Sequence, residues 1–341
     1  MLRNAPLSRR PDLRGTGNQG WGNETPMQLP FVRAIVHTAV VAAALGLACG
    51  SADAQYTTLD FPGATATRAN GISGNTIVGN YIDGSGNSNG FVYNGATYST
   101  LDFPGATTSS ANGNSGNVIV GKYTGGSGNS NGFVYSGGLY STVDFPGATA
   151  SSANGISGNS VVGNYTFGSG NPNGFVYDDA ALTFATLDFP GATATSANGT
   201  SGNFIVGNYI DSSGNENGFI HDGAIFTTLD FPGATATSAN GISGNIIVGN
   251  YIDGSGNENG FDYNDATQVF YALDDPSGAQ GTFASGITGN TVVGYYVDGG
   301  GNDHGFEYAI SPGAAPEPGS LELLIGAGVS TALCLRRRRH S

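Results

Sequence analysis

The sequence predicts an all-β fold, a six-bladed β-propeller, and three observations lead to it. A unit of about 42 residues occurs six times, turn motifs divide each unit into four short strands, and the first strand of the repeat region is the one that the last unit lacks. A fixed period of this length is typical of propellers and other repeat architectures.

The recurring unit is marked by the heptapeptide LDFPGAT, which begins with Val143 in the third copy and is degraded to LDDPSGA in the sixth. Its aspartate recurs at spacings of 42, 42, 44, 42 and 44 residues. The six positions are Asp60, Asp102, Asp144, Asp188, Asp230 and Asp274. Because every copy carries this carboxylate, we expect it to accept backbone N–H groups near the Pro-Gly turn. The alternative is a ring of six inward-facing carboxylates that collects cations or sugars.

Turn motifs predict four strands in the first unit. Residues 69–73 and 76–82 flank Gly74-Asn75, a tight-hairpin motif, and the second segment is rich in β-branched and aromatic residues. A polar loop leads to residues 91–93, and Asn94-Gly95 marks a further hairpin before TYSTLDF at 97–103. Four strands joined by hairpins form an antiparallel meander, which is typical of a propeller blade. A β-solenoid is the main alternative, but it would not need these reversals.

The ends of the repeat region favour a closed ring. The last unit, Ala284–Tyr308, has three strands, and residues 56–61 form an unpaired strand that supplies the fourth. Closure of this kind removes exposed sheet edges. Both faces of residues 76–82 carry apolar side chains, as stacked blades require, and we expect the repeated Gly79 position to permit close packing.

The composition of the repeat region argues against nucleic acid as a partner and against a disulfide framework. Residues 55–310 contain 20 Asp or Glu but only two basic residues, Arg68 and Lys122, so nucleic acid is not expected as a partner. Both cysteines lie outside this region, so no disulfide framework supports it.

The N-terminal segment, residues 1–54, has the pattern of a signal peptide. An apolar run from Ala34 to Ala48 precedes small residues, with Gln55 as the expected mature start. Met27 is the expected true initiator because signals usually have about 15–30 residues. Lipid attachment at Cys49 is the alternative, although Gly46 replaces the bulky aliphatic residue that it needs.

The C-terminal segment has three parts in order. Residues 311–320 form a linker that contains Pro316, Glu317 and Pro318. Residues 321–341 contain an apolar run of thirteen residues, about 20 Å as a helix, which is short for a transmembrane span. The basic cluster that ends the chain consists of Arg336, Arg337, Arg338 and Arg339.

This C-terminal arrangement resembles the PEP-CTERM sorting signal of Gram-negative bacteria. The resemblance implies export through the secretion machinery, transient anchoring in the membrane, and processing by an exosortase-type peptidase in cells that often make exopolysaccharide. The repeats, with A-x-G-I, I-V-G-x-Y and G-F-x-Y, are similar to the HAF-type repeats of exported bacterial proteins. The usual His of those repeats is present only at His304.

The polar loops between the second and third strands are weak candidates for calcium sites. The first loop offers oxygen ligands at Asp83, Ser85, Asn87 and Asn89, at the alternating spacing of calcium loops. One carboxylate per loop predicts weak binding, and Gly125 and Phe167 replace the leading aspartate in two copies. The candidate metal residues are Asp83, Asp211, Asp253 and Asp298.

Catalytic residues are not expected. His221 and His304 belong to no recognisable motif and are interpreted as exposed strand or loop residues. Glu216 and Glu258 break the repeat but are interpreted as solvated loop residues, and Arg68 and Lys122 are interpreted as isolated, with no phosphate-binding loop beside them. The sequence therefore predicts an exported, non-enzymatic propeller of the cell envelope or extracellular matrix, without a cofactor, that has a structural, adhesive or polysaccharide-binding role. The alternatives are an enzyme acting on matrix polysaccharide and a calcium-stabilised spacer.

Overall fold

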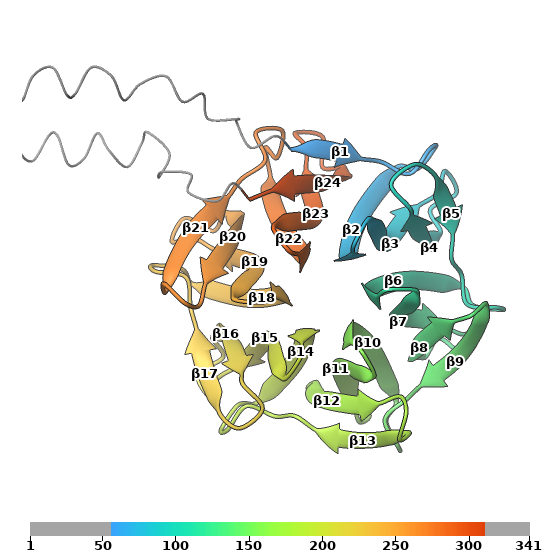
Figure 1. The fold of residues 1–341 in the computed structure, drawn as a ribbon, viewed down its shortest axis with the longest axis horizontal. Coiled ribbons are helices and arrows are strands. Elements are labelled where there is room, and N and C mark those ends of the chain that lie inside the picture. Colours follow the sequence, from blue (N-terminus) through green and yellow to red (C-terminus); the bar gives the residue numbers. More distant parts are fainter. Residues whose placement is uncertain (1–55, 311–341) are drawn as a thin grey trace, which may run out of the picture. The chain divides into compact units, whose positions relative to one another are not determined.

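The structure of the protein is a computed structural model that describes residues 56–310. These residues form 24 β-strands and no helix, so none of them crosses a membrane as a helix. The strands make six four-stranded antiparallel sheets arranged in a ring (Figure 1). The predicted six-bladed β-propeller is confirmed.

Each blade has the same strand order from the axis outwards. Blade 1 consists of β2 (Ala66–Ser73), β3 (Thr76–Ile82), β4 (Ser88–Tyr93) and β5 (Tyr98–Thr100). The innermost strands of blades 2 to 6 are β6 (Thr108–Ser115), β10 (Ala150–Ser157), β14 (Ala194–Ser201), β18 (Ala236–Ser243) and β22 (Gly281–Thr288). The second strands are β7 (Val118–Thr124), β11 (Ser160–Thr166), β15 (Phe204–Ile210), β19 (Ile246–Ile252) and β23 (Thr291–Val297). The third strands are β8 (Ser130–Ser136), β12 (Asn173–Asp178), β16 (Glu216–His221), β20 (Glu258–Asn264) and β24 (Asp303–Ala309).

The outermost strands include the one that closes the ring. In blades 2 to 6 they are β9 (Leu139–Val143), β13 (Thr183–Thr186), β17 (Phe226–Leu229), β21 (Val269–Leu273) and β1 (Thr57–Leu59). The first strand of the described chain, β1, pairs antiparallel with β24, with Leu59 opposite Gly305. Tyr56 adds a ring stack on Tyr308, with 4.4 Å between centroids. The predicted closure by the N-terminal strand is confirmed.

The fourth strand of each blade is shorter than the sequence predicts. In blade 1 it ends at Thr100. The Leu101 N–H still donates to the Gly90 carbonyl oxygen at 2.9 Å, but the Asp102 carboxylate then accepts the Gly90 N–H, also at 2.9 Å. The aspartate side chain takes the place of a backbone acceptor and ends the pairing.

The core of each blade contains one phenylalanine packed against a glycine. The six rings are fully buried, and they belong to Phe91, Phe133, Phe175, Phe219, Phe261 and Phe306. In blade 1, Gly79 lies opposite Phe91 in the sheet, and a Cβ at Gly79 would lie 2.7 Å from the Phe91 ring. The predicted packing role of this glycine is therefore confirmed.

The chain crosses from one blade to the next through the Phe-Pro-Gly turn. The Phe61 ring stacks on Tyr81 of blade 1 with 3.7 Å between centroids. The four following crossings from blade 1 to blade 5 repeat this stack at the same distance. Blade 6 lacks it because Asp275 replaces the phenylalanine.

The two faces of the ring differ in their loops. Ala66 at the start of β2 pairs with Ile82 at the end of β3, and Ile82 pairs with Ser88 at the start of β4. The crossings and the polar loops such as residues 83–87 therefore lie on one face, which we call the loop face. The tight turns such as Gly74-Asn75 lie on the opposite face.

A buried carboxylate in blade 5 predicts a pH-dependent stability. Asp262 is only 5% exposed, at a position where three blades carry valine, and burial raises its pKa to about 6. The folded pKa lies above the unfolded value of 3.8, so stability is lost as the pH rises from about 4 through 6. At pH 7.5, Asp262→Asn is expected to raise the free energy of unfolding by about 1–3 kcal/mol.

Urea unfolding of wild type and Asp262→Asn at pH 7.5 and pH 4 measures this effect. The difference between the two proteins is expected to shrink at pH 4, where both side chains are neutral. A variant that is less stable than wild type at pH 7.5 would contradict the prediction.

Candidate functional site

The innermost strands of all six blades enclose a cavity of about 850 Å³ along the axis of the ring. This volume lies in the usual range for small-molecule sites. Most of the side chains that line it toward the loop face are asparagine amides and serine hydroxyls. The other end is lined by Ile72, Ile156, Ile242 and Ile287, together with Asn114 and Thr200.

In five of the six blades, a bulge in the inner strand places one asparagine against the next blade. In β2, Ala69 pairs with Gly79 and Gly71 with Val78, so Asn70 is an extra residue. The Asn70 amide donates to the Ala111 carbonyl oxygen of blade 2 at 2.9 Å. The same bond joins the next four pairs of blades at 2.9–3.1 Å and starts from Asn112, Asn154, Asn198 and Asn240. These amides are thereby fixed around the cavity.

The junction between blade 6 and blade 1 is built differently, because Ser285 replaces the asparagine. Here Arg68 of blade 1 donates from Nε to the Asp303 carboxylate of blade 6 at 2.7 Å. The guanidinium also lies 4.7 Å above the centre of the Tyr295 ring. Tyr295 in turn stacks on Phe283, with 4.4 Å between centroids, and burial raises its pKa to about 12.

Several residues that depart from the repeat lie near the loop-face end of the cavity, and four of them line it, namely Arg68, Lys122, Tyr295 and Asp303. We call the equivalent positions of the six blades a column. The columns of Arg68, Asn80 and Ser88 are neighbours there, because Arg68 lies opposite Asn80 in the sheet and Ser88 lies opposite Ile82, two residues after Asn80. Across the six blades these columns contain the departures Arg68, Phe283, Lys122, Tyr295, Pro172, Glu216, Glu258 and Asp303. Sequence reasoning used this signal only for the two glutamates and treated Arg68 and Lys122 as isolated residues. The structure corrects that interpretation, since both cations line one cavity from neighbouring blades.

Glu216 and Glu258 are not the solvated loop residues that the sequence predicts. They begin β16 and β20, where they pair with Ile210 and Ile252, and both are half-buried. Burial raises the pKa of Glu216, although the Asn208 amide donates to its carboxylate at 2.8 Å. Neither glutamate is among the residues that line the axial cavity.

The candidate calcium loops use their carboxylates internally. The Asp83 carboxylate accepts the N–H groups of Ser85 and Asn87 at 2.8 and 2.9 Å, and the Asn87 amide at 3.0 Å. These hydrogen bonds lower the pKa of Asp83. Asp211, Asp253 and Asp298 make the same contacts with their own loops. Within residues 56–310 no group of three or more His, Cys, Asp or Glu side chains could hold a metal ion.

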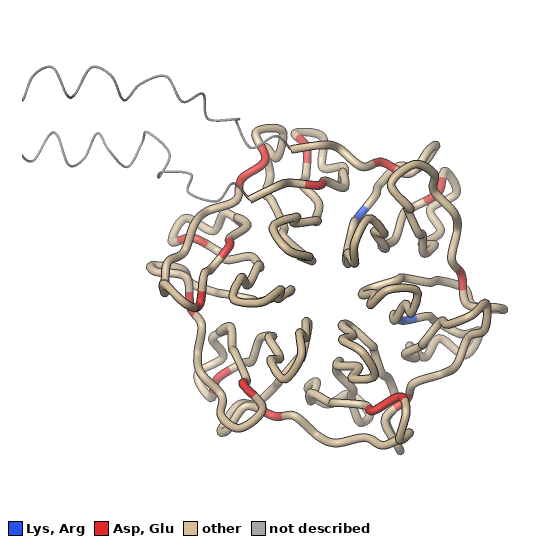
Figure 2. The backbone as a smooth tube through the Cα atoms, in the orientation of Figure 1, with Lys and Arg blue, Asp and Glu red and all other residues tan. Residues whose placement is uncertain are grey.

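The repeated aspartates of LDFPGAT also bind backbone groups. Asp102, Asp144 and Asp188 accept the N–H of the glycine that precedes the core phenylalanine at 2.9–3.2 Å. They follow the outermost strands, so they do not form a ring of carboxylates around the axis. Figure 2 shows acidic positions mainly in the outer part of the ring.

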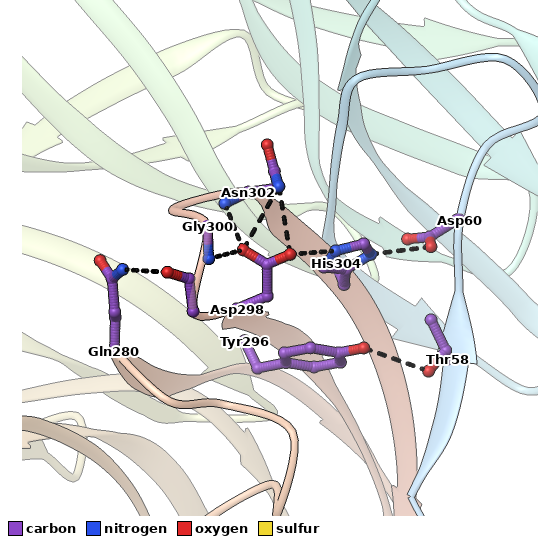
Figure 3. Close-up of polar contacts among 9 residues, drawn as sticks. Thr58, Asp60, Gln280, Tyr296, Asp298, Gly300, Asn302 and His304 are labelled. Atoms are coloured by element: carbon purple, nitrogen blue, oxygen red, sulfur yellow. Dashed lines mark hydrogen bonds and ion pairs between the residues drawn. The ribbon is translucent and has the colours of Figure 1, made fainter.

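His304 joins the closing strand to the loop of blade 6 (Figure 3). Its Nδ1 lies 2.9 Å from the Asp60 carboxylate, and its Nε2 lies 3.4 Å from that of Asp298. The ring also stacks on Tyr296. Sequence reasoning interpreted His304 as an exposed residue and missed this bridge, whose partner Asp60 comes from the other end of the described chain.

His221 lies on β16, where its Nδ1 accepts the Gly223 N–H at 3.3 Å.

The His304 bridge predicts stability that is lost at high pH. The hydrogen bond to Asp60 is the largest cause that raises the pKa of His304 above 6.5. A raised folded pKa means that the bridge stabilises the fold below pH 6.5 and that this stabilisation disappears as the pH rises through the folded value. His304→Asn, which introduces the residue of the other five blades, is expected to lower the melting temperature more at pH 6 than at pH 9. Equal losses at both pH values would show that protonation of His304 has no role.

The predicted terminal signals cannot be compared with the structure. The signal peptide, the Pro316-Glu317-Pro318 motif and the arginine cluster at 336–339 lie outside the described residues. Their roles stay predictions.

Together, the fold and the cavity define a six-bladed β-propeller with a polar axial site. No protein-family model matches the sequence, and no curated protein matches it. Among solved structures, SapL1 lectin in complex with α-methyl fucoside is similar at 15% identity, with 73% of this chain and 93% of that chain covered and a TM-score of 0.51.

Two further solved structures have lower TM-scores. The Aleuria aurantia lectin, described as a six-bladed β-propeller with a novel mode of fucose recognition, has 11% identity over 75% of this chain and 97% of that chain, with a TM-score of 0.46. TolB from Acinetobacter baumannii has 14% identity over 72% and 67% of the two chains, with a TM-score of 0.47. At such identities the similarity concerns the fold.

Proposed function

We propose that the protein is an exported, non-enzymatic propeller that binds polysaccharide through its axial cavity, with an adhesive or structural role at the cell envelope or in the extracellular matrix. The observation that carries the proposal is the cavity lining, where asparagine amides fixed by inter-blade hydrogen bonds surround about 850 Å³. Saccharide hydroxyls both donate and accept hydrogen bonds, so they match amide and hydroxyl side chains. Fixed amides bind with little loss of conformational entropy.

The similarity to SapL1 lectin is compatible with this proposal, since that protein was solved with a fucoside. The export route rests on the sequence of the two ends, and an exosortase-type peptidase is the expected processing partner. Processing at the C-terminal signal would release or anchor the propeller where extracellular polysaccharide accumulates.

The charges in the cavity favour binding over catalysis. Glycoside hydrolysis usually needs two carboxylates that flank the scissile bond. Asp303 is the one carboxylate among the residues that line the cavity, and it is paired with Arg68. We therefore favour a binding protein over an enzyme that acts on matrix polysaccharide.

Glycan binding by the full-length protein tests the proposal. Wild type is expected to bind the exopolysaccharide of the producing cell in a pull-down or on a glycan array. Ser130→Trp places a large side chain beside the cavity, which Ser130 lines, and is expected to abolish binding. Ser99→Trp lies exposed on the outermost strand of blade 1 and is the matched control. Absence of binding to every glycan, or equal binding by both variants, would contradict an axial polysaccharide site.

A further inference from the structure

We infer that the axial cavity recognises an acidic sugar, a uronate residue of a polysaccharide, through Lys122 and Arg68 on neighbouring blades. This inference rests on the proposed function, because it names the kind of saccharide that the same cavity takes. Three features of the described residues carry it: the position of the only two cations, the absence of an ion pair at one of them, and the way the other is held.

Both basic residues of the region 55–310 line the axial cavity. Figure 2 shows these two positions on adjacent blades, although acidic positions are distributed around the whole ring. They come from different columns of the repeat, since Arg68 lies on β2 and Lys122 on β7. Neither cation belongs to the repeated pattern, because the other blades have mostly serine in the first column and asparagine in the second.

Lys122 carries a positive charge that no carboxylate of the described residues neutralises in an ion pair. The side chain is exposed and lines the cavity together with Ser88, Ser110 and Ser130. Its replacement of asparagine also has a structural consequence. In blade 1 the Asn70 amide donates to Asn80, at 3.2 Å, but Asn112 has no such partner in blade 2 because Lys122 occupies that position. Lys122 therefore removes one amide–amide hydrogen bond of the repeat and places an ammonium group at that position.

Arg68 is held in one orientation with its terminal nitrogens free to bind. Its Nε donates to Asp303 and its guanidinium lies over the Tyr295 ring. Among the described residues neither Nη group donates a hydrogen bond, and the side chain is 46% exposed. A guanidinium fixed in this way can present two parallel N–H donors to a carboxylate. Hydroxyl and amide groups beside both cations suit the uncharged hydroxyls of the same sugar.

The charge of the whole propeller limits how such a ligand is recognised. The propeller is itself acidic and does not attract a polyanion over long distances. Selectivity for an acidic sugar must therefore arise from short-range contacts inside the cavity. A carboxylate and a sulfate both offer anionic oxygens to these cations. Geometry favours the planar carboxylate, which matches the guanidinium edge with two parallel bonds.

Calorimetric titration of the full-length protein with three galactose-based trisaccharides tests the inference: a neutral one, its uronate form and its sulfated form. We expect the uronate to bind at least tenfold more tightly than the neutral sugar. Lys122→Asn, which introduces the residue of four other blades, is expected to remove that difference. Lys122→Arg keeps the charge and is the matched control. Arg68→Ser is expected to act like Lys122→Asn, with its melting temperature measured in parallel because Arg68 also joins two blades.

The outcomes separate the two proposals. Equal affinity of wild type for neutral and uronate trisaccharides, or an unchanged preference in Lys122→Asn, overturns the acidic-sugar inference and leaves polysaccharide binding intact. A preference for the sulfated sugar overturns the assignment to a carboxylate. Failure of the producer's polysaccharide and of all three trisaccharides to bind contradicts the proposed function itself.

Discussion

Gly79→Ala is expected to lower the free energy of unfolding by more than about 3 kcal/mol, or to prevent folding, because overpacking alone costs about 1–3 kcal/mol in a core. The added Cβ would lie 2.7–2.8 Å from the Phe91 ring and would also collide with the backbone carbonyl of Arg68. The ring is fully buried, and the carbonyl belongs to the paired strand, so neither can move without disturbing the blade. Urea unfolding followed by tyrosine fluorescence measures the effect.

Gly84→Ala is the matched control for this prediction. Gly84 lies five residues further along the same blade, no atom lies within 4 Å of an added Cβ, and its φ angle is not in the left-handed region. This change is expected to alter stability by less than about 0.5 kcal/mol. If the two alanine variants were equally stable, the close packing of glycine against the core phenylalanine would not be a requirement of the fold.

The blade was predictable because each unit carries its own turn chemistry. Gly74-Asn75 and Asn94-Gly95 specify reversals between segments that are already suited to strands, and six copies make the pattern unmistakable. Closure was predictable for a related reason, since a count of strands leaves one unpaired strand before the first unit and only three strands in the last unit. The length of the fourth strand was not, because it depends on the Asp102 carboxylate competing for the Gly90 N–H.

The axial site was not predictable in the same way. Strict alternation along β2 would place every second side chain on one face, but the bulge at Asn70 changes the face of all the residues that follow. Arg68 and Lys122 also belong to different columns and different blades, so they come together only when blades 1 and 2 pack side by side. A column-by-column comparison of the six copies was the available signal, because it marks both cations as departures.

Removal of residues 56–61, which contain β1, is expected to have the second large effect and to destabilise the whole ring. Blade 6 would keep three strands, with the edge of β24 unpaired. Leu59 is 6% exposed and packs in the cluster that contains Phe91 of blade 1, and loss of a buried leucine alone costs about 2–5 kcal/mol. The deletion also removes the Phe61 stack on Tyr81 and the Asp60 partner of His304. A fall in melting temperature of more than 10 °C is therefore the expected order of effect.

Two point variants distinguish ring closure from a general effect of shortening the chain. Leu59→Ala removes the buried side chain and keeps the backbone pairing, so its loss of stability is expected to lie between those of wild type and the deletion. Thr57→Ala changes an exposed side chain of the same strand and is expected to be neutral. Because the closing strand joins the first described residues to the last blade, its removal affects every blade that depends on the ring being complete. A deletion variant that melts at the wild-type temperature would mean that the six blades hold together without closure, through the apolar packing and the amide bonds between successive blades.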